Sequence, residues 1–391
     1  MIDQPINLWN SKFIYILLLN LVNTTAFGII SPLIPGYVVS MGATLAFAGT
    51  VTAIFSITAL FTRPLSSLLG DRLNRKKLLL ITLLLNSILI FMYPIVTNIV
   101  WLYPLRILHG ISFSISGTVS LSLGVDFVPK ERLGEGVGYL GIGQIVGLAI
   151  GSNIGIYIME NHSYTLSFII SGITVFIVGL MLLRMKYTYI PIKSYNEKTN
   201  KWNIRLNDIL AVKLLPNAFF GGLIVITYGL TSSYLVLLGE DRQIGNIGLY
   251  FIINSIVVVI LRPIFGKMID RKGAFYIILC GFSFASVSMI LLGLSHSLLP
   301  VLIAAALVAV GTSGTMPALQ VDCIKRLDIS KRTLAMGTYM IGLDIGVSSG
   351  QLFGGVISDS FGFGITFIST GILMIIGLCL YLMYSKIITN K

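Results

Sequence analysis

The 391-residue chain has few charged residues: they make up 11% of it, against about a quarter in ordinary soluble domains. Hydrophobic residues make up 55% of the chain, and its mean hydropathy is +0.91. This composition excludes water-soluble enzymes, disordered segments and nucleic-acid-binding modules. It predicts a protein that is solvated largely by lipid.

Residues that carry catalysis or bind metals are also scarce. The three cysteines, Cys280, Cys323 and Cys379, lie far apart in apolar runs without the spacing of a metal site, so we expect them to be buried apolar side chains. The three histidines are not spaced for metal either. No phosphate-binding loop of the GxxxxGK[ST] type occurs, which excludes ATP as the energy source of this chain. We therefore expect neither an enzyme nor a bound cofactor.

Long apolar runs fill most of the chain. A helix crosses a bilayer with about 20 mostly apolar residues, and twelve segments fit that length, six on each side of one polar stretch. The predicted spans are 13–38, 44–69, 78–98, 100–127, 136–159, 163–185, 210–238, 244–268, 274–295, 299–324, 334–358 and 363–385. We predict an all-α membrane protein with halves at 1–185 and 209–391, joined by a linker loop at 186–208.

The basic residues are distributed unevenly. The net charge of +12 would suggest a polyanionic partner in a soluble protein. Here, 23 of the 27 Lys and Arg residues fall in segments on one side of the predicted spans, and Arg242 alone falls in a loop on the other side. Cytoplasmic loops carry an excess of Lys and Arg. We therefore expect a multi-pass protein of the cell membrane with both termini in the cytoplasm and no nucleic-acid partner.

The chain repeats itself at a fixed separation. An Arg-Pro pair, an Asp-Arg pair and a run of four glycines spaced four residues apart all recur in the second half. The matching positions are Arg63-Pro64 with Arg262-Pro263, Asp71-Arg72 with Asp270-Arg271, and Gly143, Gly147, Gly151 and Gly155 with Gly342, Gly346, Gly350 and Gly354. These matches predict two copies of a six-helix unit, and since six is even, the copies have the same orientation.

Each glycine run predicts a stripe without side chains along one helix face, because residues i and i+4 share a face. Another helix can approach such a stripe closely. Two interpretations remain open, namely static helix packing and an interface that slides or rocks. The occurrence of a run in both halves favours the moving interface.

Three motifs resemble those of the major facilitator superfamily. Residues 67–76, Ser-Leu-Leu-Gly-Asp-Arg-Leu-Asn-Arg-Lys, resemble the GxLaDRxGRK loop motif. Residues 106–110, Arg-Ile-Leu-His-Gly, resemble the RxxxG motif. The glycine run at 147–155 resembles the GxxxGPxxGG motif of the twelve-helix drug:proton antiporter branch. Ser67 and Asn74 replace loop-motif glycines, and Ser152 and Ile156 replace the Pro and last Gly of the antiporter motif. The resemblance implies the major facilitator fold and a secondary transporter.

The resemblance also implies gating residues. Asp71 would cap a helix N-terminus, where the helix dipole favours negative charge, and Arg75 would pair with Asp126 to latch the outward-open state. Ala274 stands where the second half would need its arginine, so we expect a second latch that is weaker or differently paired. The gating candidates are Asp71, Arg72, Arg75, Asp126, Asp270, Arg271 and Asp322. For Arg72, simple topology signalling is the alternative.

Asp344 is the only acidic residue near the middle of a predicted span. A carboxylate in apolar surroundings can take up a proton and release it when water reaches it. Asp344 is therefore our first candidate for proton coupling. The alternative is a permanent ion pair with Arg63 or Arg262, which also lie in spans.

Arg106 and His109 lie three residues apart on one face of the fourth span, which lines the central cavity in the family that the chain resembles. His109 is the second proton-coupling candidate, and a structural, hydrogen-bonded histidine is the alternative. Arg106 is a candidate for the cavity and for an anionic substrate group. The other cavity candidates are polar or aromatic, namely Asn20, Asn23, Phe113, Gln144, Asn217, Tyr228 and Gln351.

Together these features predict a secondary transporter that exports a small organic molecule in exchange for protons by alternating access. Two alternatives keep the fold: an exporter of an anionic metabolite or a metal-chelating metallophore, and a proton-coupled importer of a sugar or organic acid. The expected partners are a small-molecule substrate, protons and the lipid bilayer, and the expected state is a monomer. The proton gradient is the expected energy source.

Overall fold

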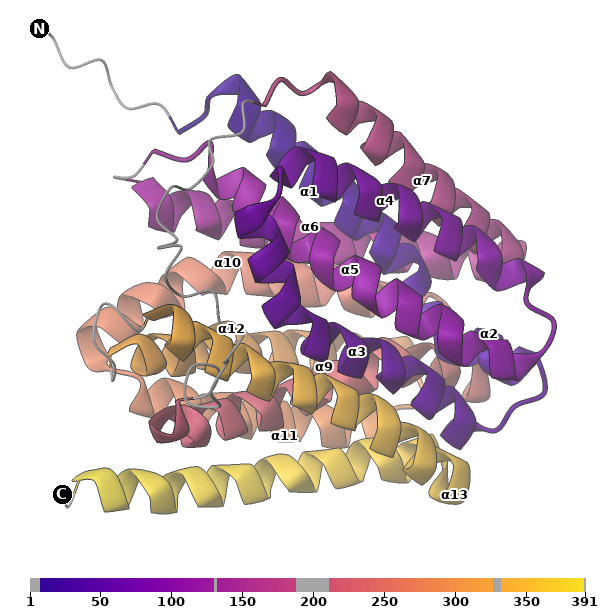
Figure 1. Ribbon diagram of the computed structural model, residues 1–391. Helices are drawn as coiled ribbons and strands as arrows, with labels where there is room; N and C mark the ends of the chain where they lie inside the picture. Colours follow the sequence, from indigo (N-terminus) through magenta and orange to yellow (C-terminus); the bar gives the residue numbers. More distant parts are fainter. Residues whose placement is uncertain (1–7, 130–131, 188–210, 326–331, 390–391) are drawn as a thin grey trace, which may run out of the picture. The chain divides into compact units, whose positions relative to one another are not determined.

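The computed structural model describes residues 8–129, 132–187, 211–325 and 332–389, and all regular structure in these ranges is helical (Figure 1). The helices are α1 (Ser11–Ile30), η1 (Ser31–Leu33), α2 (Ile34–Ser40), α3 (Leu45–Arg72), α4 (Arg75–Met92), η2 (Tyr93–Ile95), η3 (Ile99–Trp101), α5 (Leu102–Val125), α6 (Leu133–Asn161) and α7 (Tyr164–Arg184). They continue with η6 (Val212–Leu214), α9 (Leu215–Asp241), α10 (Leu249–Lys272), α11 (Phe275–Leu294), α12 (Leu298–Lys325) and α13 (Arg332–Thr389).

Within these ranges, eleven segments are long and apolar enough to cross a membrane. One of them, Thr338–Lys386 in α13, has 49 residues, a length of about 74 Å at 1.5 Å per residue against about 30 Å of bilayer hydrocarbon. The non-helical Gly362, with φ of +80°, interrupts α13 between the last two predicted spans. The predicted all-α membrane fold is confirmed, and α13 accounts for two of the predicted spans.

Contacts divide the chain into two compact units. Unit 1 comprises Met1–Leu33 and Thr58–Thr199, and unit 2 comprises Ile34–Ile57 and Asn200–Lys391. In unit 1, α1 packs on α6 and α7, and α4 packs on α5 and α7; in unit 2, α13 packs on α9 and α11, and α12 packs on α10 and α11. The predicted linker at 186–208 lies almost entirely outside the described residues. Helix α3 contributes to both units.

The first part of α3 joins unit 2 through a close approach to α13. A Cβ atom on Gly355 would lie 2.5 Å from the carbonyl oxygen of Leu45, and a Cβ on Gly49 would lie 3.2 Å from the Cα of Gly355. The backbone N–H of Leu45 donates to Oδ1 of Asp359 at 3.2 Å. Because glycine leaves room for this contact, residues that the sequence repeat assigns to the first half cluster with unit 2.

The units repeat the same internal hydrogen bonds. In unit 1, Ser87 Oγ donates to the carbonyl oxygen of Gly172 at 2.9 Å. At the matching positions of unit 2, Ser286 Oγ donates to the carbonyl oxygen of Gly371 at 2.9 Å. The repeat that the motifs predict is therefore also a repeat of packing contacts, and it extends to α4 and α7 and to their counterparts α11 and α13.

Candidate functional site

The two glycine runs pack inside the units. A Cβ on Gly151 of α6 would lie 2.1 Å from the carbonyl oxygen of Thr25 on α1, and a Cβ on Gly346 of α13 would lie 2.0 Å from the carbonyl oxygen of Gly222 on α9. Both distances are far below van der Waals contact, so the glycines allow one helix backbone to lie directly on another. Within each unit, these contacts fit the interpretation that the glycine runs serve static helix packing. A role of the glycine runs in motion stays a prediction.

The expected pair of Arg75 and Asp126 is present at one end of unit 1. Arg75 Nη1 lies 2.5 Å from Asp126 Oδ1, and Arg75 Nε donates to the carbonyl oxygen of Gly70 at 3.0 Å. Tyr187 Oη donates to the other carboxylate oxygen, Asp126 Oδ2, at 2.8 Å. Tyr187, which lies just after α7, was not expected from the sequence, and its hydroxyl gives this carboxylate a second hydrogen-bond partner.

Asn74, which replaces a glycine of the loop motif, begins α4. Its side-chain oxygen accepts from the backbone N–H of Lys77 at 3.2 Å, which satisfies one of the unpaired donors of the first helical turn. Arg271 is exposed at the end of α10. Three other gating candidates have side chains outside the described part of the structure, namely Asp71, Arg72 and Asp270.

In unit 2, the structure brings together one cavity candidate and one gating candidate. Asn217 is 1% exposed, and its Nδ2 donates to Asp322 Oδ2 at 2.7 Å and to the carbonyl oxygen of Leu319 at 3.4 Å. The carboxylate of Asp322 on α12 is thus held by an amide from α9. This contact links the two helices at the end of α12 where the expected second latch lies.

Arg106, His109 and Tyr93 form a buried polar cluster in unit 1. They are 4%, 1% and 1% exposed, respectively. Arg106 Nη1 donates to Tyr93 Oη at 3.3 Å, and Tyr93 Oη lies 3.0 Å from His109 Nδ1. Since Tyr93 Oη accepts from Arg106, its own proton is available for Nδ1, and this assignment places the proton of a neutral His109 ring on Nε2.

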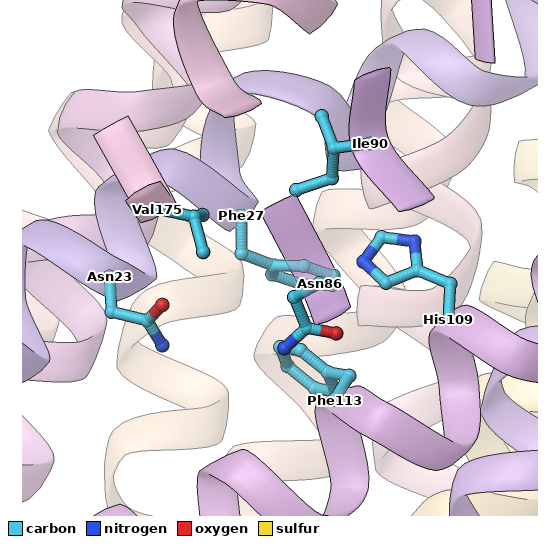
Figure 2. A pocket seen from close by; sticks show the side chains of 7 residues that line it. All are labelled: Asn23, Phe27, Asn86, Ile90, His109, Phe113 and Val175. Atoms are coloured by element: carbon cyan, nitrogen blue, oxygen red, sulfur yellow. The ribbon is translucent and has the colours of Figure 1, made fainter. Parts of the chain in front are cut away.

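A small pocket lies next to this cluster (Figure 2). Four helices of unit 1 line it with the side chains of Asn23, Phe27, Asn86, Ile90, His109, Phe113 and Val175. The rings of Phe27 and Phe113 are stacked, with their centroids 4.3 Å apart. The cavity volume is about 10 Å³, which is room for about one water molecule. The structure thus brings together three sequence-predicted candidates, Asn23, His109 and Phe113.

Two other candidates of unit 1 lie elsewhere. Asn20 is buried, and its Oδ1 accepts a hydrogen bond from Ser120 Oγ, which ties α1 to α5. Gln144 is half-buried on α6. Neither lines the pocket of Figure 2.

Asp344 and Gln351 lie on one face of α13, because they are seven residues apart. Asp344 is half-buried. Gln351 is 7% exposed, its Oε1 accepts from Ser56 Oγ at 2.9 Å, and its carbonyl oxygen accepts from Tyr234 Oη at 2.6 Å. Tyr228 on α9 is 43% exposed.

The repeat shows that the polar cluster is specific to unit 1. The residues of unit 2 that match Asn86, Tyr93, Arg106 and His109 are all buried and apolar: Ala285, Leu292, Ala305 and Val308. Asn86 and Tyr93 were not singled out from the sequence, and this comparison of repeat positions is the signal that would have found them.

The cysteines correct one expectation. Cys323 is buried, but Cys280 and Cys379 are exposed. Both exposed cysteines lie in membrane-length helices, and an apolar side chain on such a helix can face lipid instead of a protein core. Among the described residues, no group of three His, Cys, Asp or Glu side chains is placed to bind a metal.

Solved transporter structures share this fold. The nucleoside transporter NupG superposes with a TM-score of 0.74 at 14% identity, over 95% of this chain and 98% of that chain. A bacterial homologue of the human lysosomal transporter Spinster superposes with a TM-score of 0.79 at 14% identity, over 96% of each chain.

Relatives with similar sequences cover nearly the whole chain. An uncharacterised MFS-type transporter of Methanocaldococcus jannaschii is 23% identical over 86% of this chain and 88% of its own length. Multidrug resistance protein 2 of Bacillus subtilis is 25% identical over 96% of each. The model of the Major Facilitator Superfamily matches residues 16–328 and 219–388. With its membrane-length helices and its two repeated units, the chain belongs to the Major Facilitator Superfamily, a family of membrane transporters and not of enzymes.

Proposed function

We propose that the protein exports a small organic molecule in exchange for protons and acts as a monomer by alternating access. Membership of the family makes it a multi-pass secondary transporter. The similarity to multidrug resistance protein 2 of Bacillus subtilis supports export. The concentration of Lys and Arg on one side of the spans supports a cell-membrane orientation with both termini in the cytoplasm.

Asp344 is the residue on which proton coupling depends in this proposal. It lies half-buried in the part of α13 before Gly362, which matches the predicted span 334–358. Its neighbours two residues away, Gly342 and Gly346, pack directly on α9. Ionisable side chains inside a span are energetically costly and usually functional. A carboxylate here can bind a proton in one state of the transport cycle and release it in another, with His109 as the second candidate carrier.

The test is efflux driven by a pH gradient in membrane vesicles, measured with a panel of cationic, neutral and anionic toxic compounds. We expect Asp344→Asn to reduce gradient-driven efflux at least tenfold and to retain substrate exchange without a gradient. Asp359→Asn is the matched control, because Asp359 is exposed on the same helix and asparagine can still accept from the Leu45 N–H. If Asp344→Asn leaves gradient-driven efflux intact, the coupling assignment is wrong.

The same panel separates the alternatives. Efflux restricted to anionic compounds would favour the metabolite or metallophore exporter, and gradient-driven uptake would favour the importer. If Asp344 forms a permanent ion pair with Arg63 or Arg262, replacing that arginine by a neutral residue in the Asp344→Asn variant should restore activity. A proton carrier predicts no such rescue, because the neutral side chain still cannot exchange a proton.

A further inference from the structure

We infer that unit 1 holds one resident water molecule, bound between the amide oxygen of Asn86 and the imidazole of His109. The site is the small pocket of Figure 2, which four helices of this unit line. The inference depends neither on the direction of transport nor on the role of Asp344.

One buried acceptor on the pocket wall lacks a hydrogen-bond partner in the part of the chain that the structure describes. Asn86 is 4% exposed, and its Oδ1 has no hydrogen-bond partner among the described residues. Buried polar atoms of folded proteins nearly always have a partner, either protein or ordered water. An acceptor without a protein partner on the wall of a cavity therefore indicates a bound hydrogen-bond donor.

The orientation of the Asn86 amide follows from its neighbours. Asn86 Nδ2 donates to Ser116 Oγ at 3.1 Å, and Ser116 Oγ donates to the carbonyl oxygen of Phe113 at 3.0 Å. Because the only proton of the Ser116 hydroxyl is used in that bond, its oxygen must accept from Asn86. Exchanging the amide nitrogen and oxygen would place two acceptors against each other. The oxygen is therefore the atom that lies on the His109 side in Figure 2.

The pocket has the size and polarity that a buried water requires. Its volume of about 10 Å³ accommodates one water molecule. A buried water needs two to four polar partners, and the pocket offers the side chains of Asn23, Asn86 and His109. Its other lining side chains are apolar.

His109 presents a ring nitrogen to this space. Figure 2 shows one ring nitrogen directed into the pocket and the other directed away, and Nδ1 is the atom bonded to Tyr93. A water molecule in the pocket can accept from Nε2–H while it donates to Asn86 Oδ1. It then extends the chain of hydrogen bonds from Arg106 through Tyr93 and His109 to Asn86.

Helix packing does not account for these polar groups. Unit 2 builds the same pair of helices with Ala285 in place of Asn86 and Val308 in place of His109, and both are buried. The equivalent bonds of Ser87 and Ser286 show that α4 and α11 correspond in space as well as in sequence. For α5 and α12, Ser112 Oγ donates to the carbonyl oxygen of Thr82, and a Cβ on the matching Gly311 would lie 2.7 Å from the carbonyl oxygen of the matching Gly281. The amide and the imidazole are therefore additional to the packing of the fold, as expected for groups that bind a ligand.

Solid-state NMR of ¹⁵N-histidine-labelled protein in bilayers tests the site, because the chain has only three histidines. His162 and His296 are exposed and serve as internal references for bulk water. We expect magnetisation transfer from bound water to the His109 ring in the wild type. Asn86→Leu removes the acceptor and fills the space, so it should abolish this transfer. Ser87→Ala, which removes a buried hydroxyl of the same helix that does not line the pocket, should retain it.

Three results would overturn the inference. One is the absence of water transfer to His109 in the wild type, and another is an unchanged transfer in Asn86→Leu. The third comes from a high-resolution structure of the wild type, which keeps the test valid if the leucine variant does not fold. We expect an ordered solvent peak within hydrogen-bond distance of Asn86 Oδ1 without substrate; a vacant pocket, or a peak that appears only with substrate, contradicts a resident water.

Discussion

Arg242, which follows α9, caps the C-terminal end of helix α11. Its guanidinium donates to the carbonyl oxygens of Leu292 at 3.3 Å and Gly293 at 2.8 Å, and also to that of Ser295. The last carbonyl groups of a helix lack partners within the helix, and a positive charge is favourable there. Burial lowers the pKa of Arg242, and the neighbouring Asp241 raises it. From the sequence, Arg242 was notable only as a basic residue in a loop on the other side of the spans.

We predict that Arg242→Ala reduces the free energy of unfolding by about 2–3 kcal/mol, because several charge-assisted hydrogen bonds are lost. Arg242→Lys should recover only part of it, since a lysine ammonium is a point charge without the planar fork of donors. Thermal unfolding of the purified protein, followed by tryptophan fluorescence, measures the effect. Arg271→Ala, at an exposed arginine, is the control. Equal effects of the two alanine variants would contradict the prediction.

Among contacts of single residues, those between residues of known motifs could be predicted from the sequence. Those that depend on the register of neighbouring helices could not. Arg75 and Asp126 were expected as a pair from the motif resemblance. The contacts of Tyr187 with Asp126 and of Tyr93 with His109 were not, because they depend on how neighbouring helices are rotated and shifted. Hydropathy carries no information on that rotation once a span is apolar on all sides.

The glycine runs determine how closely whole helices pack. We predict that Gly151→Ala destabilises the protein by about 1–3 kcal/mol or more, because its Cβ would lie 2.1 Å from the Thr25 carbonyl oxygen and the helices would have to separate. Gly141→Ala on the same helix has no atom within 4 Å of the new Cβ and should be neutral or stabilising by about 0.5–1 kcal/mol. Thermal unfolding and the yield of monodisperse protein measure both. Similar losses in the two variants would show that contact with α1 is not the cause.

The first helix departs from its expected form. The predicted span 13–38 is not one helix, since α1 ends at Ile30 and η1 and α2 follow. Pro32 and Pro35 lie in this stretch, and proline supplies no backbone N–H to a helix. Its counterpart α9 runs unbroken over Leu215–Asp241. Apolar length predicted the membrane segment correctly but not the break within it.

At the scale of the whole molecule, α3 connects the two units. Within α3, the residues from Leu45 to Ile57 cluster with unit 2, and those from Thr58 to Arg72 cluster with unit 1. The sequence predicted twelve spans and a repeat, which are local or periodic features. It did not predict this grouping, which depends on contacts such as that of Leu45 with Asp359, 314 residues away.

We predict that fragments 1–199 and 200–391, expressed together as separate chains, purify as a complex through a tag on the second fragment. The reason is that residues 45–57 of the first fragment pack on α13 of the second. Gly49→Leu should reduce recovery of the first fragment, because its side chain would displace Tyr234 and Gly355. Gly70→Ala is the control, with only an ordinary contact to Val119 at 3.5 Å. Undiminished recovery with Gly49→Leu would refute this role of the Gly49 contact.

The shared helix has a mechanical consequence. The chain passes between the units at Leu33–Ile34, at Ile57–Thr58 and at Thr199–Asn200, and the second of these crossings lies inside helix α3. A rotation of one unit against the other would therefore load this helix near Ile57. Pro64 lies two turns further on and removes one backbone hydrogen bond, so bending is least costly in that stretch. Pro263 occupies the matching place in α10, which lies wholly in unit 2. The matching Arg-Pro pairs thus each lie within one unit, about two turns past the unit boundary in α3 and wholly inside unit 2 in α10.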